Sequence, residues 1–308
     1  MKTQNNHDLR ACGTLVKRNV SMYFKDKGTF FTSLITPIIL LVLYTTFLYN
    51  VYEDSFRAAL PAGMVIDDGL IQGLVGGVLL SSLLAVSTVT VPFCANLFMV
   101  QDRITGARGD LSIAPVKASS LAFGYYIATV INGLIISFVA LALGLAYLSV
   151  IGWYLSFADV LLLMLDVVLL VLFGTALSSL ICYPLRSQGA MSAVGTIVSS
   201  GYGFICGAYM PISSFGKALQ NTVVFLPGTH GTSLLRNHAL RGVFEGMLDD
   251  HIPQEAVDAL RAVADCKLSF FGDTVEKWVM YLVLVGSVVL MVTAFVIIMA
   301  LTERKNRK

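Results

Sequence analysis

Charged residues are absent from long stretches of the chain, and these gaps are its most regular feature. Charge-free segments run from Lys27 to Glu53, Asp68 to Asp102, Lys117 to Asp159, Arg186 to Lys217 and Lys277 to Glu303, while the segment from Asp159 to Arg186 holds only Asp166. A helix needs roughly 20 apolar residues to cross a bilayer. The pattern therefore predicts six transmembrane helices, at 29–50, 72–100, 121–147, 158–183, 190–210 and 278–302.

The third gap is too long for one helix, so it is predicted to hold a span and an external turn. That turn is expected near 149–156, where Gly152, Trp153 and Tyr154 suggest an aromatic belt at the membrane surface. The runs are uniformly apolar and do not alternate with a period of two residues, which favours helices over a β-barrel. Composition agrees, since 56% of the residues are hydrophobic and 13% are charged, against about 25% charged in a typical soluble domain. The predicted fold class is an all-α integral membrane protein with one transmembrane domain over 1–308.

Basic residues are concentrated on the side of the membrane that would hold the N-terminus. If the N-terminus is cytoplasmic, the predicted inner segments carry 14 Lys and Arg residues and the outer segments carry 7. Inner loops carry the excess of basic residues in membrane proteins. Both termini are therefore predicted to be cytoplasmic, in a multi-pass protein of the cell membrane. The first apolar run lacks a small-residue cleavage site, so it is predicted to be a retained helix and not a signal peptide.

Residues 8–26 precede the first span and predict an amphipathic helix on the inner membrane surface. The apolar face holds Leu9, Cys12, Val16, Val20 and Tyr23, and the other face holds Arg10, Lys17, Arg18, Ser21 and Lys25. An apolar stripe opposite a basic face suits an anionic inner leaflet. The alternative is a solvated helix that only leads into the first span.

Two segments outside the spans are large enough to carry a function. The cytoplasmic loop 101–120 mixes charged residues, Gly and Pro with apolar residues, and its alternative interpretation is a plain connector. The external segment 211–277 begins with apolar stretches broken by Gly and Pro, a pattern that is compatible with re-entrant backbone. Its candidate re-entrant markers are Gly207, Pro211, Pro227 and Gly228. A short helix is predicted from Pro253 to Lys267.

Motifs for catalysis are missing from the sequence. No phosphate-binding loop of the form G-x-x-x-x-G-K-[ST] occurs, so the chain is predicted not to hydrolyse ATP by itself and not to be an enzyme. The four His and five Cys residues show no metal-ligand spacing and no disulfide framework. No metal site is predicted.

Asp166 is the one ionisable residue well inside a predicted span. A carboxylate is costly in hydrocarbon, so Asp166 is predicted to face protein or a water-filled cavity. Asn96 and Asn132 are polar candidates at a similar depth, and the three residues are predicted to line a substrate or ion pathway. The alternative is that Asp166 packs helices together near the outer interface, since Asp159 lies close before it in the sequence.

Three features together carry a family resemblance. A basic amphipathic helix leads into the first span, the loop after the second span contains Asp102-Arg103 with Leu111 and Pro115 behind it, and a Gly- and Pro-rich segment follows the fifth span. In these features the chain resembles the membrane permease subunits of ATP-binding-cassette exporters of the type-2 class, which include drug-resistance permeases and polysaccharide or lipid exporters. The sequence departs from the family where Asp102 replaces a common Glu, and in an extension near 243–270.

The resemblance implies a function that needs partners. The expected partners are a cytoplasmic ATPase subunit, which would bind ATP and Mg, a second permease subunit in a homodimer or heterodimer, and the lipid bilayer, with no nucleic acid. The chain itself would bind no cofactor and would export a hydrophobic or amphipathic compound, such as a drug, lipid, peptide or glycan. The expected ATPase-coupling residues are Asp102, Arg103, Gly106, Arg108, Asp110, Leu111, Ile113 and Pro115. A secondary carrier or channel without an ATPase, and a membrane scaffold without transport, are the alternatives.

Overall fold

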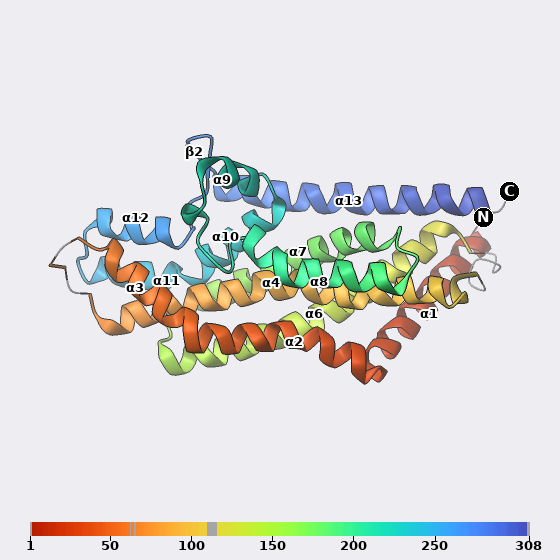
Figure 1. Cartoon of the computed structure of the whole chain (residues 1–308), viewed down its shortest axis with the longest axis horizontal. Coiled ribbons are helices and arrows are strands. Elements are labelled where there is room, and N and C mark those ends of the chain that lie inside the picture. The colour runs from red at the N-terminus through yellow and green to blue at the C-terminus, as the bar shows by residue number, and fades with distance from the viewer. Residues whose placement is uncertain (1, 62, 65, 110–115, 307–308) are drawn as a thin grey trace.

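The structure is a computed structural model that describes residues 2–61, 63–64, 66–109 and 116–306. Five helices in this part of the chain are long and apolar enough to cross a membrane, and they lie side by side along the long axis of the molecule (Figure 1). They cover Lys27–Ala59, Asp68–Ile104, Ala118–Ile151, Phe157–Cys182 and Lys277–Thr302. The first is a rod made of α2 (Lys27–Leu43), the π-helical turn η1 (Tyr44–Leu48) and α3 (Tyr49–Ala59). The others are α4 (Asp68–Ile104), α6 (Ala118–Ile151), α7 (Phe157–Cys182) and α13 (Lys277–Asn306).

The predicted span at 190–210 differs from the others in the structure. It forms α8 (Gln188–Ile205), an 18-residue helix that would reach about 27 Å at 1.5 Å per residue. Glycines and serines lower its apolar content, and α8 does not meet the length and composition of the five spans. The helix ends before Gly207, which has a φ of +75° and reverses the backbone. Of the six predicted spans, five are thus long apolar helices, and the sixth corresponds to the shorter α8, which packs against α4.

Helix α4 forms the centre of the bundle. It packs against α2, α6, α7, α8 and α10, and nearly all of its length is buried. The approach to α7 is close at Gly174, where an added Cβ would lie 2.5 Å from the carbonyl oxygen of Thr88. Helices α2 and α13 bury a much smaller share of their surface and expose apolar side chains, as expected for helices that face lipid.

Both termini lie at the same end of the bundle (Figure 1). Helix α1 (Lys2–Lys25) crosses this end at an angle to the spans and packs along α6. The segment that joins α4 to α6 and the turn that joins α7 to α8 come from the same end, because α4 and α7 finish there. This end therefore holds the described parts of the segments for which a cytoplasmic position is predicted.

The opposite end carries the segment between α8 and α13. It contains η2 (Ile212–Ser214), α9 (Lys217–Val224), α10 (Pro227–Ala239), α11 (Arg241–Asp249), α12 (Gln254–Val263), β1 (Ser269–Phe270) and β2 (Asp273–Thr274). The strands form an antiparallel hairpin in which Ser269 pairs with Thr274. The short helix predicted from Pro253 corresponds to α12. Helix α10 enters the bundle and packs against α4, α7 and α13.

Candidate functional site

An ion pair joins the surface helix to the bundle at the end that holds the termini. The guanidinium of Arg18 on α1 donates two hydrogen bonds, both at 2.7 Å, to the two carboxylate oxygens of Asp102 at the end of α4. Tyr125 on α6 donates a third bond to Asp102, also at 2.7 Å. The hydrogen bonds to Asp102 raise the pKa of Arg18 above its usual range, and a guanidinium is always charged in a protein. A two-pronged Arg–carboxylate pair fixes geometry as well as distance, and it ties α1, α4 and α6 together.

Asp102 is one of the predicted coupling residues. It is 4% exposed, and its carboxylate faces Arg18 on α1. Arg18 was predicted for the basic face of α1, and the structure turns it toward the bundle. The pair links the two cytoplasmic elements that the sequence treats as separate.

The other predicted residues of the surface helix are divided between two environments. Tyr23 is fully buried and donates its hydroxyl proton to Ser33 at 2.6 Å. Val16 and Val20 are half-buried, while Leu9, Arg10 and Lys17 are exposed. Leu15, Asn19 and Tyr23 form the most buried line of α1. The buried face of α1 therefore shares only Tyr23 with the predicted apolar stripe, because α1 packs on α6 and does not lie only against lipid.

A second set of contacts joins the loop after α4 to the turn after α7. Arg103 donates hydrogen bonds to the carbonyl oxygens of Tyr183 and Leu185. Its guanidinium lies 4.6 Å from the centre of the Tyr183 ring, and that of Arg108 lies 5.2 Å from the same centre. Cation–π contacts of this kind are attractive. The turn at 183–187 is consequently held against the end of α4 and the loop that follows it.

A hollow of about 730 Å³ opens beside these contacts. Its lining residues are Arg103, Ile104, Gly106, Arg108, Gly109, Tyr183, Pro184, Arg186, Ile298 and Thr302. Gly106 has a φ of +85°, a conformation that favours glycine. The remaining predicted coupling residues, Asp110, Leu111, Ile113 and Pro115, lie outside the described residues.

The predicted pathway residues occupy two separate places. Asn96 donates hydrogen bonds to Ser178 at 2.6 Å and Ser179 at 3.1 Å, and it accepts one from Thr129 at 3.1 Å. Asn132 is also buried, and its side-chain oxygen has no partner within the described residues. These contacts fill the seam between α4, α6 and α7.

Asp166 lies elsewhere on α7, about 18 Å along the helix axis from Ser178 at 1.5 Å per residue. Its carboxylate lies 2.6 Å from His238 Nδ1 on α10 and accepts a hydrogen bond from the Tyr281 hydroxyl on α13 at 2.9 Å. Asp166 is fully buried. The structure thus does not bring Asp166 together with Asn96, and each is satisfied by partners within the chain.

The re-entrant markers surround a buried ion pair that sequence reasoning missed. Arg236 on α10 donates to Asp265 at 2.7 Å and to the carbonyl oxygen of Gly207 at 2.7 Å. Asp265 also accepts from the backbone N–H of Ile212 at 2.8 Å. Arg236 is 1% exposed and Asp265 is 4% exposed. The pair fixes α10 to the turn after α8 and to the end of α12.

The predicted markers have distinct roles in this arrangement. Pro227 is the first residue of α10, a position that suits proline because no helical N–H is lost. Gly228 packs against the Tyr202 hydroxyl and leaves no room for a side chain. Pro211 precedes η2 and is partly exposed. A helix rich in polar residues, α10, is thus inserted among apolar spans. The sequence did hold a signal for this arrangement. Arg236 and His238 follow an apolar segment that Gly and Pro interrupt, and ionisable residues in such a place need partners.

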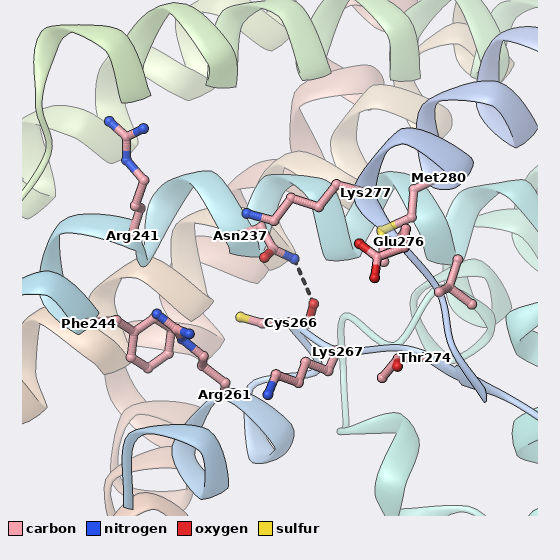
Figure 2. Close-up of a pocket in the computed structure, with 11 residues that line it drawn as sticks. Asn237, Arg241, Phe244, Arg261, Cys266, Lys267, Thr274, Glu276, Lys277 and Met280 are labelled. Carbon is pink, nitrogen blue, oxygen red and sulfur yellow. Dashed lines mark hydrogen bonds between the residues drawn. The ribbon is translucent and has the colours of Figure 1, made fainter. Parts of the chain in front are cut away.

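A second hollow, of about 320 Å³, lies at the opposite end of the molecule from the termini (Figure 2). Its basic lining residues are Arg241, Arg261, Lys267 and Lys277, and its one acidic lining residue is Glu276. Sequence reasoning did not identify it, because the four basic residues come from α11, α12, the start of the hairpin and α13.

Comparison with known proteins identifies a family. No curated protein matches the chain. The sequence model of the ABC-2 type transporter family matches residues 10–239, which run from within α1 to the end of α10 and include both the Arg18–Asp102 pair and the Arg236 helix. The family is the non-catalytic membrane domain of ABC transporters, and its members work with ATPase subunits. The match covers well over half of the 308 residues, and this multi-pass membrane protein therefore belongs to the ABC-2 type transporter family.

Proposed function

We propose that the chain is the permease subunit of an ATP-driven exporter that moves a hydrophobic or amphipathic compound outward, using ATP and Mg held by a separate cytoplasmic ATPase subunit. The observation that carries the proposal is the connected surface at the end that holds the termini. There the Arg18–Asp102 pair and the Arg103–Tyr183 contact join α1, α4, α6 and the α7–α8 turn. A push applied to this surface would be transmitted to several spans at once.

We further propose that α8 completes a sixth crossing and that both termini are cytoplasmic. The termini lie at the same end of the bundle (Figure 1), which requires an even number of crossings. The five long spans supply an odd number, so the shorter α8 is the helix that makes the number even. The basic residues predicted on the inner side support the choice of that end as the cytoplasmic one.

Cysteines introduced one at a time can test this orientation. In a background without native cysteine, we expect Asp250→Cys to react with an impermeant thiol reagent added to sealed cells, because Asp250 is exposed at the end opposite the termini. Thr105→Cys should stay unlabelled until the membrane is opened, since Thr105 follows α4 at the other end. Labelling of the 105 site in intact cells would reverse the proposed orientation.

A second permease subunit is proposed to pack on α8. This helix exposes Ser192, Thr196 and Ser200 at helical spacing. Small and hydroxyl-bearing residues let helices approach closely within a membrane. A protein partner, either a second copy or a related permease, suits this face better than lipid does. We also keep Asp166 as a candidate residue of the transport pathway, with His238 and Tyr281 as its partners in one subunit.

The proposal is tested by purifying the chain together with its ATPase subunit and measuring which compounds change ATP turnover. We expect Leu111→Asp to uncouple ATP hydrolysis from transport or to release the ATPase. Loss of an apolar side chain at the centre of an interface lowers the binding free energy by an amount on the order of 2 kcal/mol. Membrane insertion should be unchanged. The absence of any ATPase from the purified complex, combined with transport that needs no ATP, would replace the proposal by a carrier or channel.

The double change Asp102→Asn and Arg103→Gln separates two roles of the loop. If the loop only contacts the ATPase, this variant and Leu111→Asp should have the same effect. The structure leads us to expect a further effect of the double change on α1, because Asp102 holds Arg18. Normal transport with a bound ATPase in both variants would reduce the loop to a connector.

A further inference from the structure

The hairpin before α13 presents two aromatic rings to the surroundings of the protein. Phe270 and Phe271 form an edge-on pair with ring centres 4.7 Å apart. Phe271 is 77% exposed, and Phe270 is 36% exposed. In Figure 1 the hairpin stands beside α9 and the outer end of α13, at the side of the molecule and not at its far tip.

The turn of the hairpin is an unusual place for a phenylalanine. Phe271 and Gly272 are its two central residues, with φ values of +49° and +102°. Turns with two positive φ angles favour Asn-Gly or Asp-Gly. A bulky residue in this conformation is unfavourable by roughly 1–2 kcal/mol. The exposed ring of Phe271 gains no burial within the chain that would offset this cost.

The hairpin is nevertheless held firmly. Leu268, directly before β1, is 2% exposed and belongs to a small apolar core with Val223, Leu234 and Met280. The backbone N–H of Val275 bonds to the carbonyl oxygen of Leu268 at 2.9 Å. The aromatic tip is thus presented by a fixed element and is not a loose loop.

The position of α13 sets the depth of the hairpin. The candidate span begins at Lys277, and only two residues separate it from the end of β2. Trp278 follows and is 64% exposed, at the depth where tryptophan is enriched in membrane proteins. Leu219 and Phe225 of the neighbouring α9 segment are also exposed. Exposed apolar side chains thus occur on the hairpin, on the α9 segment and at the start of α13, with the exposed charged residues Glu276 and Lys277 between the hairpin and Trp278.

Basic residues flank the same hairpin. Lys267 and Lys277 bracket it in sequence, and both line the hollow of Figure 2 together with Arg261. Lys267 pairs with Asp258 at 3.0 Å. Lys277 forms no ion pair with the residues that the structure describes, so its charge can bind an added anion. The aromatic tip and the basic hollow together match a phospholipid, which has acyl chains in the membrane interior and a phosphate at the membrane surface.

We propose that, in the orientation given above, the Phe270–Phe271 tip inserts into the outer leaflet and that the adjacent basic hollow takes the phosphate of an anionic phospholipid. The inserted rings recover the burial that the turn lacks in water. The headgroup contact fixes the segment from α9 to the hairpin at the membrane surface. Neither contact depends on which compound is exported, so the proposal can fail while the exporter function stands.

Depth-dependent quenching tests the insertion. Phe271→Trp is placed in a background with Trp153→Phe and Trp278→Phe, and the protein is reconstituted in nanodiscs whose lipids carry brominated acyl chains. We expect blue-shifted emission and strong quenching. Glu255→Trp, on the exposed surface of α12, is the matched control and should show neither. Emission and quenching at 271 equal to those at 255 would place the tip in water. A blue shift without quenching would mean that a second protein copy covers the tip, and it would also overturn the proposal.

Thermal stability tests the headgroup site. Phosphatidylglycerol should raise the melting temperature above its value in phosphatidylcholine, because a ligand that binds only the folded state stabilises it. Lys267→Gln combined with Lys277→Gln should abolish this increment. An equal increment in the variant and the parent would place the lipid elsewhere. An equal increment from inorganic phosphate alone would show a free-anion site and remove the lipid from the proposal.

Discussion

Arg236→Met is expected to lower the free energy of unfolding by about 3–5 kcal/mol, the usual cost of removing one partner from a buried ion pair. The change leaves Asp265 charged inside the protein and also removes the donor to the Gly207 carbonyl. Methionine fills much of the same space, so the loss comes from the unpaired charge and not from a cavity. Both lost contacts lie in the protein interior, where water cannot replace the missing guanidinium.

The cysteines near this pair provide the measurement. Cys206 is fully buried and Cys266 is 5% exposed, so the rate at which they react with a thiol dye on heating or in denaturing detergent reports unfolding of this region. Arg57→Met is the control, because Arg57 is 43% exposed and pairs with Glu53 and Asp68 near the surface. Exposed pairs contribute about 0–1 kcal/mol.

The double variant Arg236→Met with Asp265→Asn identifies the cause. Asp265 has a φ of +48°, which asparagine tolerates, and the amide oxygen can still accept from Ile212. We expect the double variant to be more stable than Arg236→Met alone, because no buried charge remains unpaired. Equal losses in both variants would mean that the lost packing of Arg236, and not the charge of Asp265, explains the effect.

The long spans could be predicted because hydrophobicity alone determines them. A helix such as α4 needs about 20 apolar residues to cross the bilayer, and the absence of charge from Asp68 to Asp102 marks it. The same reasoning did not distinguish α8 from the five long spans. Its glycines and serines lack charge and therefore resemble a span when only gaps between charges are compared, although they contribute little apolar surface.

The ion pairs could not be predicted because their partners are far apart in sequence. Arg18 and Asp102 are 84 residues apart, and His238 and Asp166 are 72 residues apart. Helical periodicity places a residue on a face, but packing between helices decides what that face meets. Asp166 looked isolated for this reason, and His238 on α10 provides its partner.

Arg18→Ala is expected to lower ATP-dependent transport by about 30-fold while the spans remain inserted. Truncating one partner of a buried, hydrogen-bonded charge pair costs about 2–5 kcal/mol, and we take the lower end because the Arg18 side chain is 33% exposed. Each 1.4 kcal/mol changes an equilibrium about tenfold. The free-energy difference that favours α1 packed against α4 and α6 over α1 released from them should therefore become much smaller.

The charge of α1 must be separated from the contact that Arg18 makes. Lys17→Ala removes the same charge from the neighbouring, exposed position, so it is the matched control and should transport normally. Arg18→Lys keeps the charge but cannot make both hydrogen bonds to Asp102, so an intermediate rate is expected. Transport and ATP turnover are measured in the same proteoliposomes with the ATPase subunit present. If Arg18→Ala and Lys17→Ala behave alike, the pair with Asp102 holds the helix in place without carrying the coupling, and the hollow beside Arg103 becomes the surface to test.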